Sequence, residues 1–262
     1  MNLNLENKTA LVCGGSQGLG LASAKELALL GATVVLLSRN RERLAAALRQ
    51  LPAHHGQQHD FLAVDLSKPE HTKEAIVSFL SQGKTIHILV NNAGGPPSAT
   101  LLETPAEDLE VSFRTHLVSS HILAQLLVPG MKQAGFGRII NIISTSAKQP
   151  INGLGISNTV RASVANWAKT LSNEIAHFGI TVNNVLPGFT NTDRLAYLFD
   201  KQAQEGGVTK GEILQKTISA IPAKRLGEPS ELGSVVAFLS SPAAAYINGV
   251  NLPVDGGRTG CL

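Results

Sequence analysis

Apolar segments of strand length alternate with longer segments of helical periodicity along nearly the whole chain. The strand-like segments lie at 8–13, 33–38, 61–65, 86–91, 138–143, 181–186 and 251–254. They are apolar on both faces, which is typical of parallel strands covered by helices on both sides of the sheet. Helices are expected at 21–30, 41–50, 68–82, 105–132, 154–178 and 229–239. The alternation predicts an α/β fold with a doubly wound parallel sheet, as a single domain over residues 1–262.

Composition and charge exclude several classes of protein. The net charge is +3 and the basic residues are scattered, whereas nucleic-acid binding needs a basic stripe or patch. No apolar run approaches the ~18 residues of a membrane span, and the N-terminus lacks the features of a signal peptide. Two cysteines give no disulfide framework, and the histidines of segment 54–59 lack the partners of a metal site. We therefore expect a cytoplasmic protein that binds no nucleic acid, membrane or metal.

A glycine-rich turn follows the first strand and precedes the first helix. Gly14, Gly18 and Gly20 give the spacing G-x3-G-x-G, with Ser16, Gln17 and Leu19 between them. Glycines allow the backbone to approach a pyrophosphate, and the N-terminus of the helix offers free N–H groups and the positive end of its dipole. The turn therefore predicts a Rossmann-type dinucleotide site, although glycine turns of this kind also occur for purely structural reasons.

The end of the second strand carries Ser38 and Arg39, with Arg41 and Arg43 shortly after. An acidic residue at this turn would accept a hydrogen bond from the ribose 2′-hydroxyl of NAD, whereas an arginine favours the 2′-phosphate of NADP. Because no acidic residue follows the strand directly, we predict that NADP(H) is preferred over NAD(H). The alternative is that Arg39 is only a solvated charge at the start of a helix.

Further motifs follow in a fixed order along the chain: Asp65, Asn91-Asn-Ala-Gly94, Arg138-Ile-Ile-Asn-Ile-Ile-Ser144, Pro187-Gly188 and Val254-Asp-Gly-Gly257. Together with the glycine turn, they resemble the short-chain dehydrogenase/reductase family, and within it most closely the 3-oxoacyl-[acyl-carrier-protein] reductases. The resemblance covers nearly all residues from 8 to 257. It implies an oxidoreductase that acts on a small-molecule carbonyl or acyl substrate.

The resemblance also implies which residues hold the cofactor. The glycine turn would bind the pyrophosphate, and the other contacts would come from Asp65 and Leu66 at the adenine, Asn91, Ala93 and Gly94 at the adenosine ribose, and Pro187, Gly188 and Thr190 at the nicotinamide end. Structural alternatives remain for two of these positions. Asp65 is also placed to cap a helix, and Asn91 and Asn92 are placed to satisfy backbone groups at a strand end.

The chemistry of the resembled family uses an asparagine, a serine and the motif Tyr-x-x-x-Lys. Ser144 stands at the serine position, Ser157 at that of the tyrosine, Arg161 at that of the lysine and His116 at that of the asparagine. A serine hydroxyl is far less acidic than a phenol, and an arginine keeps its charge but gives up no proton. Arg161 remains suited to holding the cofactor ribose. The tetrad is therefore atypical.

Three interpretations of this departure remain open. The chain is an oxidoreductase whose proton comes from His116, Lys148 or Tyr197; or it binds NADP(H) without turnover, as a sensor or scaffold; or it catalyses another reaction, with Ser157 and Arg161 binding an anionic group. His116 is equally well explained as a helix histidine facing polar neighbours. Tyr246, near the last strand, is expected to pack in the fold.

The segment 190–221 is more polar than its surroundings and is expected to form helical pieces of a mobile lid over the substrate. Its lysines and those just after it are candidates for an acyl-carrier-protein surface, or are ordinary solvated side chains. The two longest helices carry apolar residues on more than one face. The resemblance implies that they build a homotetramer, and we expect a homotetramer or a dimer.

Overall fold

The computed structural model describes residues 1–261, without the side chain of Glu205; residue 262, included in the single-domain prediction, lies outside the described part. A seven-stranded sheet with the order β3-β2-β1-β4-β5-β6-β7 forms its centre. Every neighbouring pair is parallel. The strands are β1 (Thr9–Cys13), β2 (Thr33–Ser38), β3 (Asp60–Ala63), β4 (Ile88–Asn91), β5 (Gly137–Ile142), β6 (Ile180–Pro187) and β7 (Asn251–Val254).

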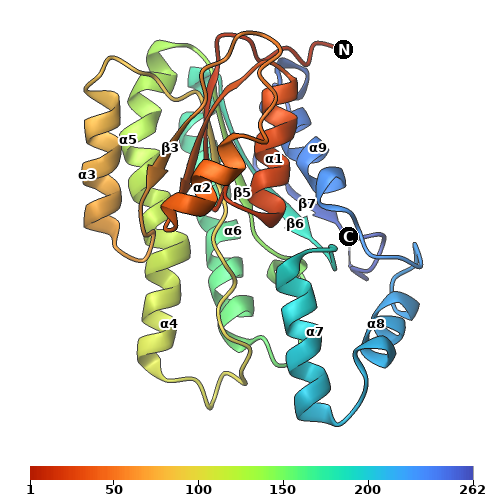
Figure 1. The fold of residues 1–262 in the computed structure, drawn as a ribbon. Coiled ribbons are helices and arrows are strands. Elements are labelled where there is room, and N and C mark those ends of the chain that lie inside the picture. Colours follow the sequence, from red (N-terminus) through yellow and green to blue (C-terminus); the bar gives the residue numbers. More distant parts are fainter. Residues whose placement is uncertain (262) are drawn as a thin grey trace.

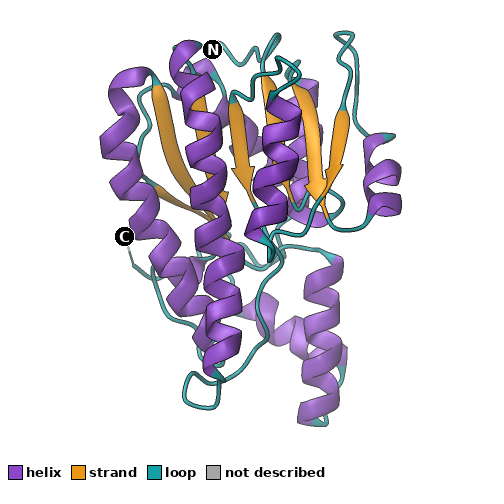
Figure 2. Ribbon diagram, turned by 90° about the vertical axis from the view of Figure 1, so that its left-hand side faces the viewer, coloured by secondary structure: helices purple, strands orange, loops and turns teal. Residues whose placement is uncertain are grey.

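Helices cover both faces of this sheet (Figure 1). One buried cluster packs one face of the sheet against α1 (Gly18–Leu29), α2 (Arg41–Leu48) and α9 (Pro229–Ser240). A second cluster packs the other face against α3 (Pro69–Leu80), α5 (Ser119–Gln133) and α6 (Gly155–Ile175). Figure 2 views the molecule from the second side and shows long helices in front of the strands. The predicted single-domain, doubly wound α/β fold is confirmed.

Single residues of β1 show why these strands are apolar on both faces. Val12 belongs to the first cluster, whereas Leu11 and Cys13 belong to the second. Successive side chains of a strand point to opposite faces, so a strand that is covered on both sides needs apolar residues throughout. Cys13 is a buried free thiol, and burial raises its pKa to about 12, so it packs as an apolar side chain.

The boundaries differ from the predicted ones at two informative places. The predicted helix over 105–132 is interrupted: α4 (Ala106–Phe113) and α5 are joined by a π-helical turn over Arg114–Val118. Such a turn has no distinct composition, so apolar periodicity does not reveal it. The first helix begins at Gly18 and not at 21, because the glycine turn leads directly into it.

The segment 190–221 forms the predicted helical pieces, α7 (Asp193–Gly206) and α8 (Lys210–Ser219). Thr192 caps α7, and Thr209 forms a capping box with Glu212 at the start of α8. Figure 1 shows both helices beyond the carboxyl ends of the strands. They therefore cover the edge of the sheet at which ligands of such folds bind. Among the described residues, no helix combines the length and hydropathy needed to cross a membrane.

A row of four asparagine side chains crosses one half of the sheet. The Nδ2 of Asn91 donates to Oδ1 of Asn141, Asn141 donates in the same way to Asn184, and Asn184 to Asn251, each at 2.8 Å. These residues are directly paired in the register of β4, β5, β6 and β7. Because a buried amide is stable only when it is hydrogen-bonded, this asparagine ladder fixes the register of the four strands. It lies near the carboxyl ends of β4 and β5, in the middle of β6 and at the start of β7.

The ladder leads to a stability prediction. Asn141→Ala leaves the Asn91 donor and the Asn184 acceptor without their partner, and we expect the free energy of unfolding to fall by about 2–4 kcal/mol. Urea denaturation monitored by circular dichroism measures this change. Asn173→Ala, on the exposed face of α6, is the matched control and should shift the same quantity by less than about 0.5 kcal/mol. Equal shifts in both variants would show that the ladder does not stabilise the fold.

Candidate active site

Most of the predicted site residues lie at or just after the carboxyl ends of β1 to β6, which a parallel sheet brings to one edge. The loop after β4 reaches the loop after β1: Nδ2 of Asn92 donates to the Cys13 carbonyl at 3.3 Å. Asn92 therefore satisfies a backbone group at a strand end, which is one of the roles predicted for this segment. Asn91 is held in the asparagine ladder by its side chain.

The glycine turn after β1 is too tight for any side chain at two positions. A Cβ at Gly14, where φ is +59°, would lie 2.6 Å from Nδ2 of Asn92. A Cβ at Gly20 would lie 2.2 Å from the Gly14 carbonyl oxygen. Gln17, the N-cap residue of α1, makes no side-chain capping bond, and the first turn carries no acidic residue. The first N–H groups of α1 thus remain available to an anion, which fits the pyrophosphate of a dinucleotide.

Ser16 and Leu19 complete this turn. Ser16 is partly buried, and Leu19 packs against the apolar cluster beneath α1. The carbonyl of Leu19 accepts a hydrogen bond from Ser23 Oγ at 2.8 Å, one helical turn later. The turn is therefore anchored from below by packing and leaves its N–H groups on the outer side.

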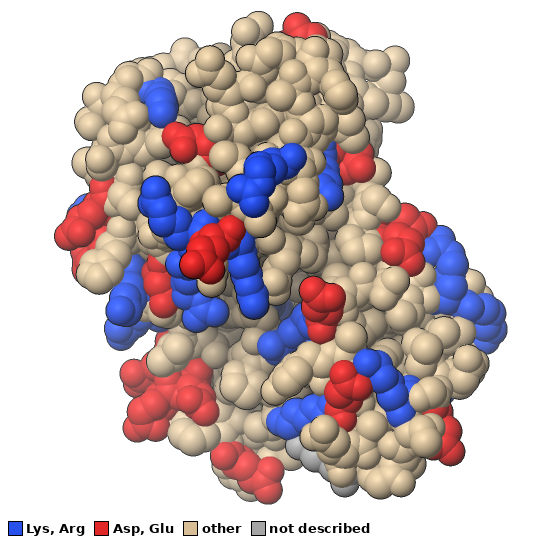
Figure 3. Space-filling view, viewed as in Figure 1, with Lys and Arg blue, Asp and Glu red and all other residues tan. Residues whose placement is uncertain are grey.

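The three arginines after β2 differ in their contacts. Arg43 donates to Oε1 of Gln17 at 3.1 Å, and the guanidinium of Arg41 lies 5.2 Å from the ring centre of Phe61. Arg39 is exposed, and its side chain has no hydrogen bond or ion pair recorded within residues 1–261. Figure 3 shows Lys and Arg side chains gathered over the region where Figure 1 places α2. The end of β2 thus presents an uncompensated cation beside the glycine turn.

Two further predicted site residues, Ser38 and Asp65, are less exposed than Arg39. The Ser38 hydroxyl at the end of β2 is buried without a hydrogen-bond partner. Oδ1 of Asp65 accepts from both the backbone and the hydroxyl of Ser67, at 3.0 and 2.9 Å. Asp65 therefore closes a turn before α3, although the N-cap residue of that helix is Lys68. Leu66 lines the small polar cavity described below.

Ser144 and Ser157 lie on either side of the turn between β5 and α6. Oγ of Ser144 accepts a hydrogen bond from the Ser146 N–H at 3.0 Å, which caps a short 3-10 turn over Thr145–Ala147. The Ser144 hydroxyl keeps its own proton for donation. Ser157 is partly buried in the first turn of α6, and the described part of the chain shows no hydrogen bond from its side chain.

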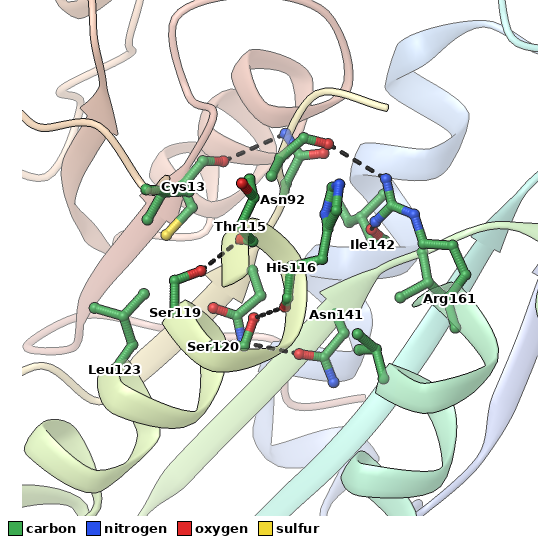
Figure 4. A pocket seen from close by; sticks show the side chains of 15 residues that line it. Cys13, Asn92, Thr115, His116, Ser119, Ser120, Leu123, Asn141, Ile142 and Arg161 are labelled. Carbon is green, nitrogen blue, oxygen red and sulfur yellow. Dashed lines mark hydrogen bonds between the residues drawn. The ribbon is translucent and has the colours of Figure 1, made fainter. Parts of the chain in front are cut away.

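Arg161, one turn after Ser157, is 7 % exposed and points into a small polar cavity below the loop after β4 (Figure 4). Its Nη1 donates to the Ile142 carbonyl at 3.2 Å and its Nη2 to the Ala93 carbonyl at 3.4 Å. These bonds join the ends of β4 and β5. Burial, with the positive charge of Arg194, lowers the pKa of Arg161 to about 10. The side chain is therefore still a cation at neutral pH.

His116 lies in the π-helical turn and is 5 % exposed. Burial and the charge of Arg161 lower its pKa to about 2, against the smaller opposing effect of a hydrogen bond with the Gly94 backbone. Figure 4 shows its ring directed toward Arg161. A π-helical turn often marks a functional position, and here it brings a neutral imidazole into the cavity. His116 thus faces polar neighbours from a helical turn, as one of its two interpretations predicts, and its role in proton relay stays a prediction.

The other candidate proton donors, Lys148 and Tyr197, differ in their exposure to solvent. Lys148 is partly buried just after the 3-10 turn, whereas Tyr197 on α7 is 60 % exposed. Tyr246 is fully exposed, so the expectation that it packs in the fold is wrong. Tyr246 lies in the segment between the 3-10 turn over Pro242–Ala244 and β7, which leaves its ring uncovered.

The nicotinamide end of the predicted site is formed by the loop after β6. A Cβ at Gly188 would lie 2.6 Å from Cβ of Asp255, so the loop passes directly against the end of β7. Thr190 is buried, and its hydroxyl donates to the Gly188 carbonyl at 3.4 Å. The structure therefore brings Pro187, Gly188 and Thr190 to the same edge of the sheet as the glycine turn.

Sequence reasoning missed Arg194. This residue of α7 donates through Nη2 to the carbonyls of Gly95 and Pro96, at 3.0 and 3.2 Å, and so ties α7 to the loop after β4. No local pattern could have indicated this, because the partners are almost 100 residues apart in the sequence. A Cβ at Gly94, just before this contact, would meet no atom within 4 Å. Space for a ligand therefore remains beside Gly94.

Comparisons with known proteins agree with this architecture. The family model described as enoyl-(acyl carrier protein) reductase matches residues 14–259. The 3-oxoacyl-[acyl-carrier-protein] reductase of Vibrio cholerae is 35 % identical over 255 residues, which cover 97 % of this chain and 98 % of the relative.

Solved structures are similar over the full chain. An L-sorbose reductase from Gluconobacter frateurii, complexed with NADPH and L-sorbose, is 33 % identical, with a TM-score of 0.94 and complete coverage of both chains. A gluconate 5-dehydrogenase from Burkholderia cenocepacia, in complex with NADP and tartrate, is 30 % identical with a TM-score of 0.87, covering 100 % of this chain and 98 % of that one. The chain belongs to the short-chain dehydrogenase/reductase family and is an oxidoreductase of that type.

The burial of His116 leads to a pH prediction. Its folded-state pKa lies below the ordinary value of about 6.5, so protons bind more strongly to the unfolded chain. The contribution of His116 to stability is fully present above about pH 6.5 and decreases as the pH falls below that value. Nuclear magnetic resonance of the imidazole nitrogens, assigned with His116→Gln, should show no titration in the mildly acidic range. A midpoint near the ordinary value would contradict the described environment.

Proposed function

We propose that this chain is a reductase that uses NADP(H) in preference to NAD(H) and acts on the carbonyl group of a small molecule. One observation carries the cofactor assignment: a glycine turn without a side-chain cap, at the N-terminus of α1, lies beside an arginine that has no partner among the described residues. The first feature suits a pyrophosphate and the second a 2′-phosphate. When bound, the nicotinamide supplies the hydride that reduces the carbonyl carbon.

Each part of the cofactor has proposed partners along the edge of the sheet. The N–H groups of the turn from Gly14 to Gly20 hold the pyrophosphate, and Ser38 and Arg39 hold the 2′-phosphate. The remaining proposed contacts are Asp65 and Leu66 with the adenine, Asn91, Ala93 and Gly94 with its ribose, and Pro187, Gly188, Thr190 and Arg161 with the nicotinamide half. The open space at Gly94 and the buried hydroxyl of Ser38, which lacks a partner, support these assignments.

The proposed active site is an atypical form of the tetrad that the resemblance implies. Ser144 donates a hydrogen bond from its hydroxyl to the substrate oxygen, while Ser157 and Arg161 stand in the tyrosine and lysine positions. Arg161 supplies a fixed positive charge below the reacting groups. Neither Ser157 nor Arg161 is a good proton donor at neutral pH, so the proton comes from another group. His116, Lys148 and Tyr197 are the candidates. Burial lowers the pKa of His116 to about 2, so at neutral pH it is a neutral imidazole that can relay a proton but does not store one. Of the three, Tyr197 is the one that is well exposed to solvent.

Two features of the site favour an alternative function, a non-catalytic NADP(H)-binding sensor or scaffold. Two nitrogens of Arg161 are bound to backbone carbonyls, and the recorded contacts of the described residues include no partner for the Ser157 hydroxyl. A site with this arrangement can hold a nucleotide without transferring a proton. In a third interpretation, Ser157 and Arg161 bind an anionic group for a different reaction, but the burial of Arg161 disfavours it.

The lysines and arginines near α7 and α8 give little support for an acyl-carrier-protein surface. Lys210 pairs with Asp200 at 2.9 Å, and Arg225 pairs with Glu231 at 2.6 Å. Lys224 donates to the Ser219 carbonyl at 2.7 Å. Because these charges already have partners within the chain, we favour a small-molecule substrate over a carrier protein.

We further propose that the protein works in the cytoplasm as a homotetramer or a dimer. Apolar side chains remain exposed along α4 and the π-helical turn, with Val111 at 54 % and Val118 at 42 %, and just before α4, with Leu102 at 98 %. Tyr246 beside β7 offers a second exposed apolar surface. Exposed groups of this kind are typical of surfaces that associate. A monomer mass by light scattering at micromolar protein would remove this part of the proposal.

Arg39→Ala tests the cofactor assignment. Loss of a charge-assisted hydrogen bond of about 1.5–3 kcal/mol should weaken NADPH binding by roughly tenfold or more and leave NADH binding unchanged. Calorimetric titration of both nucleotides into native and variant protein measures the difference. Arg49→Ala, an exposed arginine at the other end of α2, serves as the matched control. Equal affinity of the native protein for NADPH and NADH would reject the preference.

Oxidation of NADPH in the presence of a panel of ketones and quinones tests the activity itself. We expect turnover with at least one small carbonyl compound, and we expect Ser144→Ala to lower kcat by about 10²–10³-fold through loss of a donor to the substrate oxygen. Ser78→Ala, on the exposed face of α3, should leave the rate unchanged. Tight NADPH binding without turnover over the whole panel would favour the sensor or scaffold.

A further inference from the structure

A cavity of about 420 Å³ lies beside the turn that follows Ser144. Its wall is formed by the turn between β5 and α6, by the end of α8 and by the segment after β7. The polar side chains that line it are Thr145, Gln149, Asn152, Arg258 and Thr259. A volume of this size is typical of pockets that bind small molecules. Because Thr145 directly follows Ser144, a ligand in this cavity lies next to the proposed reacting carbonyl.

Arg258 is the only charged side chain among the described residues that line this cavity. Asp255, the acidic residue closest to it in the sequence, is already saturated by its own turn. Oδ1 of Asp255 accepts from the Gly257 N–H at 3.0 Å, and Oδ2 accepts from the N–H and the hydroxyl of Thr259 at 2.7 and 2.5 Å. No ion pair of Arg258 is recorded within residues 1–261. Within residues 1–261, its positive charge is therefore not neutralised by an ion pair.

The position of Arg258 is fixed from two sides. Its guanidinium lies 4.7 Å from the ring centre of Phe189, in the loop after β6 that belongs to the nicotinamide end of the site. The segment beyond it is tied to the opposite wall, because the Gly260 N–H donates to Oε1 of Gln149 at 3.1 Å. Stacking on an aromatic face orients the planar guanidinium without using its N–H donors. Arg258 thus offers free, oriented donors to the cavity.

We propose that Arg258 binds the carboxylate of the substrate, and that the substrate is a small hydroxylated keto acid or the corresponding hydroxy acid. A guanidinium matches a carboxylate through two parallel hydrogen bonds. One cation surrounded by neutral polar groups suits one carboxylate, and Thr145, Gln149 and Asn152 are suited to hydroxyl groups. This substrate class rests on the proposed reductase function, because it places the reacting carbonyl beside Ser144.

Steady-state kinetics with a matched pair of substrates test the assignment. Arg258→Gln should raise KM for a hydroxylated keto acid by roughly 10- to 100-fold and leave KM for the corresponding neutral keto sugar and for NADPH unchanged. Arg258→Lys should restore part of the loss, because it keeps the charge but not the two parallel bonds. Arg49→Gln, on the exposed end of α2, is the matched control. Equal effects on the acid and the neutral sugar would overturn the proposal.

Binding without turnover separates this proposal from the proposed function. Gluconate, its neutral counterpart glucitol and inorganic phosphate are titrated calorimetrically into protein saturated with NADP⁺. We expect gluconate to bind to the native protein and not to Arg258→Gln, with glucitol unaffected by the substitution. Gluconate binding without reduction of any carbonyl compound would reject the reductase and keep the carboxylate site. Reduction of neutral ketones without gluconate binding, or a preference for phosphate, would reject the carboxylate site and keep the reductase.

Discussion

The hydrogen bonds of Arg161 to the Ile142 and Ala93 carbonyls hold the centre of the site together. A buried arginine without a carboxylate is stable only if its donors are satisfied, and here strand-end carbonyls satisfy two of them. The ends of β4 and β5 are thereby fixed from below, and burial together with the charge of Arg161 lowers the pKa of His116 and keeps it neutral. The asparagine ladder fixes the same two strands one step further back. The structural role of Arg161 and its proposed role in the reaction therefore meet at one side chain.

Several arginines along this edge of the sheet have no carboxylate partner in the described chain, and three of them lie at proposed ligand positions. Arg39 lies after β2, Arg161 lies below the loop after β4, and Arg258 lies after β7. The proposed 2′-phosphate and the proposed substrate carboxylate would lie at the two ends of this row. In the proposed arrangement, the phosphate and the carboxylate of the ligands neutralise these cations. Phe189, in the loop after β6, contacts Arg258 and so connects the nicotinamide end to the substrate cavity.

The sequence predicts the sheet, the positions of most helices and the family, because apolar alternation and the glycine turn report on local geometry. It also predicts that Ser144 follows a strand and that Ser157 and Arg161 share one face of the next helix, which the structure shows as the end of β5 and the first turns of α6. It does not reveal the π-helical turn that buries His116, nor the contact of Arg194 with Gly95. These features depend on packing between segments that are distant in the sequence, and no local spacing or periodicity in the sequence indicates such packing.

The central claim is that Arg161, and not a lysine, serves the working site together with Ser157. The double variant Ser157→Tyr with Arg161→Lys tests this claim, with NADPH oxidation measured for native, single-variant and double-variant proteins of verified fold. We expect turnover in the native protein and no gain in the double variant, because the donors of a lysine all lie on one nitrogen, whereas Arg161 reaches the Ile142 and Ala93 carbonyls through two nitrogens. NADPH oxidation that appears only in the double variant would contradict the account and would show that the native chain binds the cofactor without using it.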